Sequence, residues 1–271
     1  MRVFFFILCF GLALCAQSQT DTGKIILPSA KMYGDKVSYF TADNLGNIYV
    51  LASAGLLKKY DSNGDSLNVY NNVRRYGALY TIDATNPMKL LLYHKSFSTI
   101  VMLDRYMNSV NTIDLRKAGI FQAKAVGLSN DNNVWVFDEQ SSKLKKINEN
   151  GELLSETTDL RQVLDEVPSP EKILDRDGFV YLYDPARGVY IFDYYGVLKN
   201  ELHFTGISDI QVINKAIVGR KQHNFVRYMP DTIDLQEHIL PRVIQNAQKI
   251  CIMPQGIYVL ENENITLHPY Q

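Results

Sequence analysis

Short runs of alternating apolar residues, each bounded by turn residues, recur along most of this chain. The stretch DNLGNIYVL at residues 43–51 is echoed by SNDNNVWVFD at 129–138, LDRDGFVYLYD at 174–184 and MPQGIYVLEN at 253–262. Alternation with a period of two is typical of half-buried β-strands, and Gly, Asn and Asp between the runs are typical of tight turns. No long segment has the period of a helix. The pattern therefore predicts an all-β protein.

The alternating runs repeat at a nearly constant interval. Their central aromatic or aliphatic residues recur every 36 to 46 residues, at Tyr49, Leu92, Trp135, Tyr181, Ile217 and Tyr258. A second turn follows each of these positions, so that each unit contains four short strands. Four antiparallel strands in about 40 residues are typical of a propeller blade. We therefore predict a six-bladed β-propeller with four antiparallel strands per blade.

Glycines occupy the expected hairpins of most units. They are Gly46, Gly64, Gly151, Gly178 and Gly196. Such turns need positive backbone φ angles, which glycine adopts without strain, and neighbouring Asp or Asn residues are expected to cap the turns through their own side chains. We prefer this structural role to metal binding. The fifth unit, with VINKAIVGR at 212–220, lacks a glycine in its turn.

The two ends of the chain complement each other. The last unit, from about residue 248 to 270, has room for only three strands, while KIILPS at 24–29 is a short β-prone run before the first unit. We expect this run to supply the outer strand of the sixth blade and so close the ring, which protects a sheet edge that would otherwise be open.

The phrase DNLGNIYV resembles the recurrent D-x-x-G-N-I-Y-V phrase of six-bladed NHL-like propellers, and LDRDGFVYLYD is a second good match. The resemblance covers about residues 24–271. It implies a propeller fold, but the family includes binding scaffolds, assembly subunits and a few hydrolases or lyases, so it does not choose a function. The segment AQSQ also resembles the signal ends of exported proteins from Bacteroidota-type bacteria.

The first residues resemble a secretory signal. The segment MRVFFFILCFGLALCAQSQ has Arg2, then an apolar run too short for a membrane span, then small and polar residues. We expect a signal peptide at 1–18 and a mature propeller domain at 19–271, with no transmembrane segment. Lipidation at Cys15 is the alternative, but the bulky Leu14 departs from the usual processing site. Only Cys251 remains in the mature chain, which excludes an intrachain disulfide and favours a periplasmic or outer-membrane location.

Charge and motifs exclude several classes of function. The 28 basic residues are balanced by 29 acidic ones, so the chain lacks the basic excess of a nucleic-acid binder. It contains no G-x-S-x-G elbow, Walker loop or C-x-x-C pair, and its five histidines match no local metal motif. We therefore predict no cofactor.

Two surfaces are candidates for binding a partner. On the face that carries the loops between blades, basic residues recur at Arg74, Arg75, Arg116, Lys117, Arg161, Arg187 and Arg242. They form either a docking ring for an acidic partner or ordinary surface pairs with nearby carboxylates. On the opposite face, the hairpin DYYG presents Tyr194 and Tyr195, and paired tyrosines are good interface anchors.

The expected function is a noncatalytic, exported interaction subunit at the bacterial cell envelope. One concrete version is an accessory part of an outer-membrane transport, secretion or assembly complex. The alternatives are a small-ligand or glycan binder, and a lactonase-like, metal-dependent hydrolase whose site at the pore would use Asp138, Asp184 and Glu261. Glycan sites often stack sugars on an exposed Trp, but Trp135 is expected to pack between blades.

Overall fold

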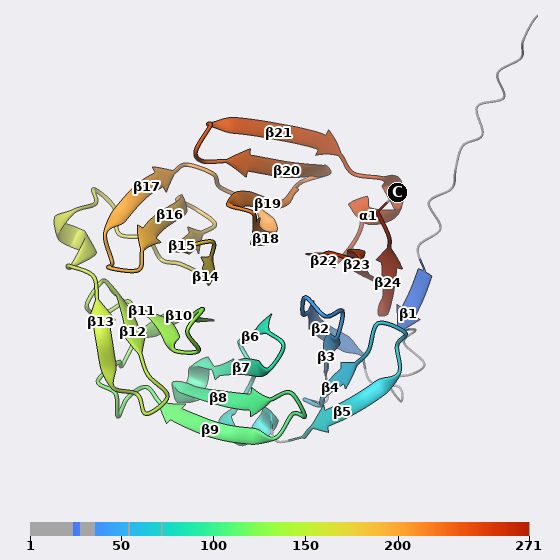
Figure 1. The fold of residues 1–271 in the computed structure, drawn as a ribbon, viewed down its shortest axis with the longest axis horizontal. Helices are drawn as coiled ribbons and strands as arrows, with labels where there is room; N and C mark the ends of the chain where they lie inside the picture. The colour runs from blue at the N-terminus through green and yellow to red at the C-terminus, as the bar shows by residue number, and fades with distance from the viewer. Residues whose placement is uncertain (1–23, 28–35, 54, 72, 271) are drawn as a thin grey trace, which may run out of the picture.

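The computed structural model describes residues 24–27, 36–53, 55–71 and 73–270. These residues form a ring of six sheets around a central axis, each sheet having four antiparallel strands (Figure 1). The predicted six-bladed β-propeller is therefore confirmed. The proposed signal peptide, including Cys15, lies outside the described residues.

Each blade runs outward from the axis in chain order, except that the outer strand of blade six comes from the N-terminal part of the chain. The strands of blades one to three are β2 (Val37–Ala42), β3 (Ile48–Ala52), β4 (Leu57–Tyr60), β5 (Ser66–Tyr70); β6 (Thr81–Asn86), β7 (Lys89–His94), β8 (Thr99–Asp104), β9 (Ser109–Asp114); β10 (Ala123–Leu128), β11 (Val134–Asp138), β12 (Lys143–Ile147) and β13 (Leu153–Glu156). Those of blades four to six are β14 (Lys172–Arg176), β15 (Phe179–Asp184), β16 (Gly188–Asp193), β17 (Leu198–Leu202); β18 (Ser208–Ile213), β19 (Ala216–Lys221), β20 (Asn224–Met229), β21 (Asp234–Ile239); β22 (Lys249–Met253), β23 (Gly256–Glu261), β24 (Asn264–His268) and β1 (Lys24–Leu27).

The helical elements of the described residues are short and lie between strands. They are the 3₁₀ turns η2 (Val73–Tyr76), η3 (Lys95–Phe97) and η4 (Leu160–Gln162), and the single-turn helix α1 (Arg242–Gln245). Within the described part of the chain, none of the helices has the length and apolar character needed to cross a membrane.

The ring closes as the sequence predicted. Strand β1 pairs antiparallel with β24, with Lys24 opposite Leu267 and Ile25 opposite Thr266. The N-terminal strand thereby becomes the outer strand of blade six, next to the last strand of the chain (Figure 1). This pairing satisfies the backbone groups that β24 would otherwise expose at its edge.

The core consists of six apolar clusters, one between each pair of neighbouring blades. Trp135 is 1% exposed and packs against residues of blade four, which confirms its predicted position between blades. Cys251 is buried between blades six and one. Burying one large apolar side chain contributes roughly 1.5–3 kcal/mol, so these interfaces hold the ring together.

The hairpin turns follow the predicted chemistry. Gly46 has φ +84°, and the Asp43 carboxylate accepts hydrogen bonds from the backbone N–H groups of Leu45 and Asn47. Blade five forms its first hairpin without glycine, because Asn214 and Lys215 both adopt positive φ angles, 49° and 63°. Two such residues make the mirror-image turn that suits a two-residue hairpin, and Asn tolerates it better than most residues.

Candidate functional site

The propeller has two different faces. One face carries the turns that join the first strand of a blade to the second, and the third strand to the fourth. We call it the hairpin face. The connector face carries the loops between the second and third strands of each blade and the segments that link one blade to the next. All of the predicted basic residues lie on the connector face, and the DYYG hairpin lies on the hairpin face.

The basic residues divide into paired and unpaired groups. Arg161 binds Asp159, with Nη2 2.6 Å from Oδ2, and Arg187 contacts both Asp184 and Glu166. Arg116, Lys117 and Arg242 are exposed and have no ion pair among the described residues. Arg75 lies over the ring of Tyr76, at 5.3 Å from its centre. Arg74 belongs to η2, but its side chain lies outside what the structure describes.

Asp138 and Asp184, two of the three carboxylates proposed for a hydrolase site, have other partners, and Glu261 is the partly exposed last residue of β23. Asp138 is buried and accepts hydrogen bonds from Ser141 and from Lys145 Nζ at 2.7 Å. Asp184 accepts from the backbone N–H of Ser169 and binds Arg187. Among residues 24–27, 36–53, 55–71 and 73–270, no group of three or more His, Cys, Asp or Glu side chains is arranged to hold a metal ion. The structure thus uses Asp138 and Asp184 to fix their own loops.

The two tyrosines of the DYYG hairpin differ. Tyr195 is 89% exposed. Tyr194 instead turns inward, and its hydroxyl donates to Asp175 Oδ1 at 2.7 Å. The expectation of two displayed tyrosines therefore holds only for Tyr195, because a buried carboxylate offers Tyr194 a charged acceptor.

Asp175 is the centre of a buried hydrogen-bond cluster between blades three and four. Besides Tyr194, its carboxylate accepts from Trp135 Nε1 at 2.8 Å, from Ser129 Oγ at 2.9 Å and from the backbone N–H of Asn130 at 3.2 Å. The donors are neutral, and together they satisfy both carboxylate oxygens.

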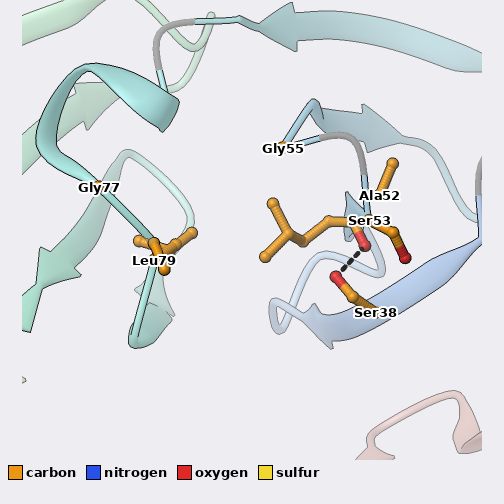
Figure 2. A pocket seen from close by; sticks show the side chains of 8 residues that line it. Ser38, Ala52, Ser53, Gly55, Gly77 and Leu79 are labelled. Carbon is orange, nitrogen blue, oxygen red and sulfur yellow. Dashed lines mark hydrogen bonds between the residues drawn. The ribbon is translucent and has the colours of Figure 1, made fainter.

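A pocket of about 560 Å³ opens on the connector face between blades one and two. Figure 2 shows its two sides, the end of blade one and the segment that leads into blade two. Small and apolar residues line it, including Ser38, Ala52, Ser53, Gly55, Gly77 and Leu79. None of its lining residues is charged, so the pocket suits an apolar side chain better than it suits chemistry at a reactive group.

Aromatic and cationic residues surround the blade-two side of this pocket. Phe97 is 53% exposed and lies against Gly77, and Tyr80 is also exposed. The Lys95 ammonium lies 4.6 Å from the centre of the Tyr80 ring, and Arg75 belongs to the 3₁₀ turn η2, which ends directly before Gly77. We call Arg75, Tyr80, Lys95 and Phe97 the blade-two patch. Exposed aromatic rings next to cations are typical of protein interfaces.

His94 lies beneath this patch. It is fully buried, its Nδ1 is 3.2 Å from the Gly77 carbonyl oxygen, and its Nε2 has no hydrogen-bond partner. Burial lowers the pKa of His94 below its ordinary value, because the charged imidazolium is poorly solvated there.

A second cluster, which the sequence analysis missed, lies near the axis at the connector end of blades four to six. Strand β18 has a bulge between Ser208 and Gln211, and Asp209 within it has φ +54°. The bulge presents the Asp209 carboxylate to Arg220 Nη2 at 2.6 Å and to Lys249 Nζ at 3.6 Å. Bulges often redirect a side chain in this way.

Lys172, the first residue of β14, completes this cluster. Its ammonium donates to the carbonyl oxygen of Ile210, inside the same bulge, at 2.8 Å. Burial, and then repulsion from Lys249, lower the pKa of Lys172 to about 8. We call Lys172, Asp209, Arg220 and Lys249 the axial cluster.

The sequence contained a weak signal for the axial cluster. Lys172 and Lys249 both stand directly before an apolar inner-strand run, in EKILD and QKICI. Equivalent positions in different blades face the same axis, so a repeated lysine there indicates charge at the axis. The β18 bulge had no such signal, because Asp209 and Arg220 are distant in the sequence.

Comparisons with known proteins identify the fold. No family model and no curated protein matches the chain. A catalytically inactive virginiamycin B lyase from Staphylococcus aureus with quinupristin is similar with a TM-score of 0.60 and 12% identity, over 88% of this chain and 85% of that chain. A streptogramin B lyase is similar with a TM-score of 0.59 and 16% identity, over 85% of this chain and 78% of that chain. The Pan2 WD40 domain of Neurospora crassa has a TM-score of 0.58 and 13% identity, over 88% of this chain and 81% of that chain. At these identities the similarities establish the propeller fold alone.

Proposed function

We propose that this chain is an exported, noncatalytic propeller that binds a partner protein through its connector face, as a subunit of an assembly at the bacterial cell envelope. The observation that carries the proposal is the blade-two patch beside an apolar pocket. Phe97 and Tyr80 offer aromatic contact area, and the pocket accepts an apolar side chain from the partner.

The charges of this face indicate the chemistry of the partner. Arg116, Lys117 and Arg242 have no ion pairs among the described residues, and Arg75 and Lys95 stack on tyrosine rings. An acidic surface would complement these cations and speed association. The proposed partner therefore presents an acidic segment with one apolar side chain that enters the pocket.

Affinity capture from detergent-solubilised envelope of the source organism tests this proposal. The bait is the mature chain, either unchanged or with Arg75→Glu and Phe97→Ala. We expect these substitutions to reduce recovery of the partner by at least about tenfold, because they remove one aromatic contact and reverse a charge.

The matched control combines Tyr195→Ala and Lys215→Glu on the hairpin face, where both side chains are exposed. This control should recover the partner as the unchanged chain does. Loss of the partner from the control but not from the connector-face variant would move the docking surface to the hairpin face and contradict the proposal.

The proposed export has its own test. Mass spectrometry of the chain purified from cells should find a mature N-terminus at Gln19, after removal of residues 1–18. A lipid-bearing chain that begins at Cys15 would replace the soluble exported form by a membrane-anchored one. An uncleaved chain that stays in the cytoplasm would contradict export.

A further inference from the structure

The axial cluster contains more positive than negative charge. Arg220 and Lys249 share one carboxylate, that of Asp209, and Lys172 contacts only a neutral carbonyl. Within the described residues, no other carboxylate lies at ion-pair distance from any of these three cations. Like charges held close together in a partly buried setting raise the free energy of the unliganded protein.

Specific bonds hold this cluster in place, unlike a set of solvated surface lysines. The side chains of Asp209 and Arg220 are only 8% and 9% exposed, and Arg220 Nη1 also donates to the carbonyl of Ala247 at 2.8 Å. Gln211 joins the bulged strand to blade six by bonding both the N–H and the carbonyl of Ile252. The positive φ angle of Asp209 costs conformational energy, and it persists because the surrounding bonds enforce it.

The surroundings of the two ammonium groups favour a ligand over free water. Lys249 Nζ lies 4.5 Å from the centre of the Tyr39 ring, and its side chain is only 20% exposed. Lys172 is also partly buried. A compact anion between them would replace repulsion by two charge-assisted hydrogen bonds.

We propose that the axial cluster is a binding site for a small anion that carries a carboxylate or a phosphate group, with the ammonium groups of Lys172 and Lys249 as its direct contacts. Arg220 has a different role: it positions Asp209, to which it is already bound. This site is independent of protein docking on the connector face.

Isothermal titration calorimetry of the mature chain with inorganic phosphate and with succinate, at constant ionic strength and pH 7, tests the site and separates the two anion classes. We expect Lys172→Met to weaken binding by about tenfold or more, since hydrogen bonds to charged groups are strong. Lys172→Arg should stay within about threefold of the unchanged chain, because it keeps the charge. The control Lys199→Met removes one exposed charge from β17 and should bind normally.

Two results would overturn the proposal: failure of the unchanged chain to bind either anion, or equal affinity in the Lys172→Met and Lys199→Met variants. If Lys172→Met does not fold, as judged by circular dichroism, Lys249→Met and the unchanged chain decide the question. Lys249→Met should also weaken binding by about tenfold.

The unchanged chain provides a second, variant-free measurement. The charged or titratable groups that act on Lys172 are Lys249, Cys251, Asp209 and Asp83. An anion beside Lys172 favours its protonated form, so binding at pH 8 should take up a fraction of a proton. Titrations in two buffers with different ionisation enthalpies measure this uptake. Anion binding without proton uptake would place the anion elsewhere.

Discussion

The Asp175 cluster and the axial cluster both contain one buried aspartate between blades, but their charges balance differently. Asp175 accepts hydrogen bonds from four neutral groups, among them Trp135 and Tyr194. Asp209 pairs with two cations, while the ammonium of Lys172, on β14, bonds only a neutral carbonyl of the same bulge. Both aspartates help join neighbouring blades.

This difference distinguishes a cluster that stabilises the fold from a cluster that can bind a ligand. Every donor around Asp175 has its acceptor, so that cluster needs nothing further and serves the fold. The axial cluster keeps two positive charges in excess among the described residues, and only an added anion would balance them. A buried polar cluster is therefore a candidate site when it holds several like charges with too few counter-charges.

Asp175→Ala should give the largest loss of stability. It leaves four donors without an acceptor, two of them buried and two partly buried. We expect the free energy of unfolding to fall by about 4 kcal/mol, from several lost bonds to a charged group. Urea unfolding at pH 7 measures it. Tyr194→Phe, which removes one donor, should cost about 1 kcal/mol; a similar cost for both variants would contradict the central role of Asp175.

Asp209→Asn should destabilise the protein somewhat less, by about 3 kcal/mol, because it leaves the buried Arg220 guanidinium without its counter-ion. Asn is chosen because it tolerates the positive φ angle of this position. Phosphate should restore part of the lost stability if the axial cluster binds anions. Unfolding of the Asp209→Asn variant, measured with and without phosphate at equal ionic strength, tests this restoration.

Deletion of Lys24–Leu27 tests the closed ring on which both clusters depend. It removes the outer strand of blade six and exposes the edge of β24. Backbone hydrogen bonds contribute about 0.5–1.5 kcal/mol each, so we expect a loss of about 2–3 kcal/mol and a less cooperative thermal transition. Unchanged calorimetric unfolding of the truncated chain would contradict closure by β1.

His94 is a buried polar residue whose own charge changes with pH, unlike the two aspartates. Its pKa is lowered in the folded protein, so the unfolded chain binds the proton more readily. Stability should be full above the unfolded pKa of about 6.5 and should fall as the pH drops below it, by up to about 1.4 kcal/mol per pH unit. Between pH 7.5 and pH 5.5, the free energy of unfolding of the unchanged chain should fall by about 1 kcal/mol more than that of the His94→Gln variant. Urea unfolding at both pH values measures this.

Charge reversal on the connector face should have the smallest effect on folding. Arg116 is exposed and unpaired among the described residues, and Arg161 pairs with Asp159 at the surface. We expect the Arg116→Glu, Arg161→Glu double variant to lose almost no thermal stability, because exposed ion pairs contribute little. A larger loss in thermal unfolding would mean that these arginines support the fold, which would weaken their assignment to partner binding.

The sequence by itself determined the local and repetitive features. The alternation of apolar residues predicted the strands, the glycine turns predicted the hairpins, and the count of strands predicted that residues 24–29 would close the ring. It also predicted that Trp135 would be buried between blades. These features depend on residues close together in the chain, or on a pattern repeated in every blade, and so are visible without coordinates.

Only the tertiary structure decided which side chains meet between blades. The contact of Tyr194 with Asp175 depends on how a hairpin folds back on its own blade, and the pocket beside Gly77 depends on how blades one and two are spaced. The axial cluster depends on a bulge in β18 that joins residues from three blades. Bulges and blade packing follow from long-range contacts, and no local pattern in the sequence specifies these contacts.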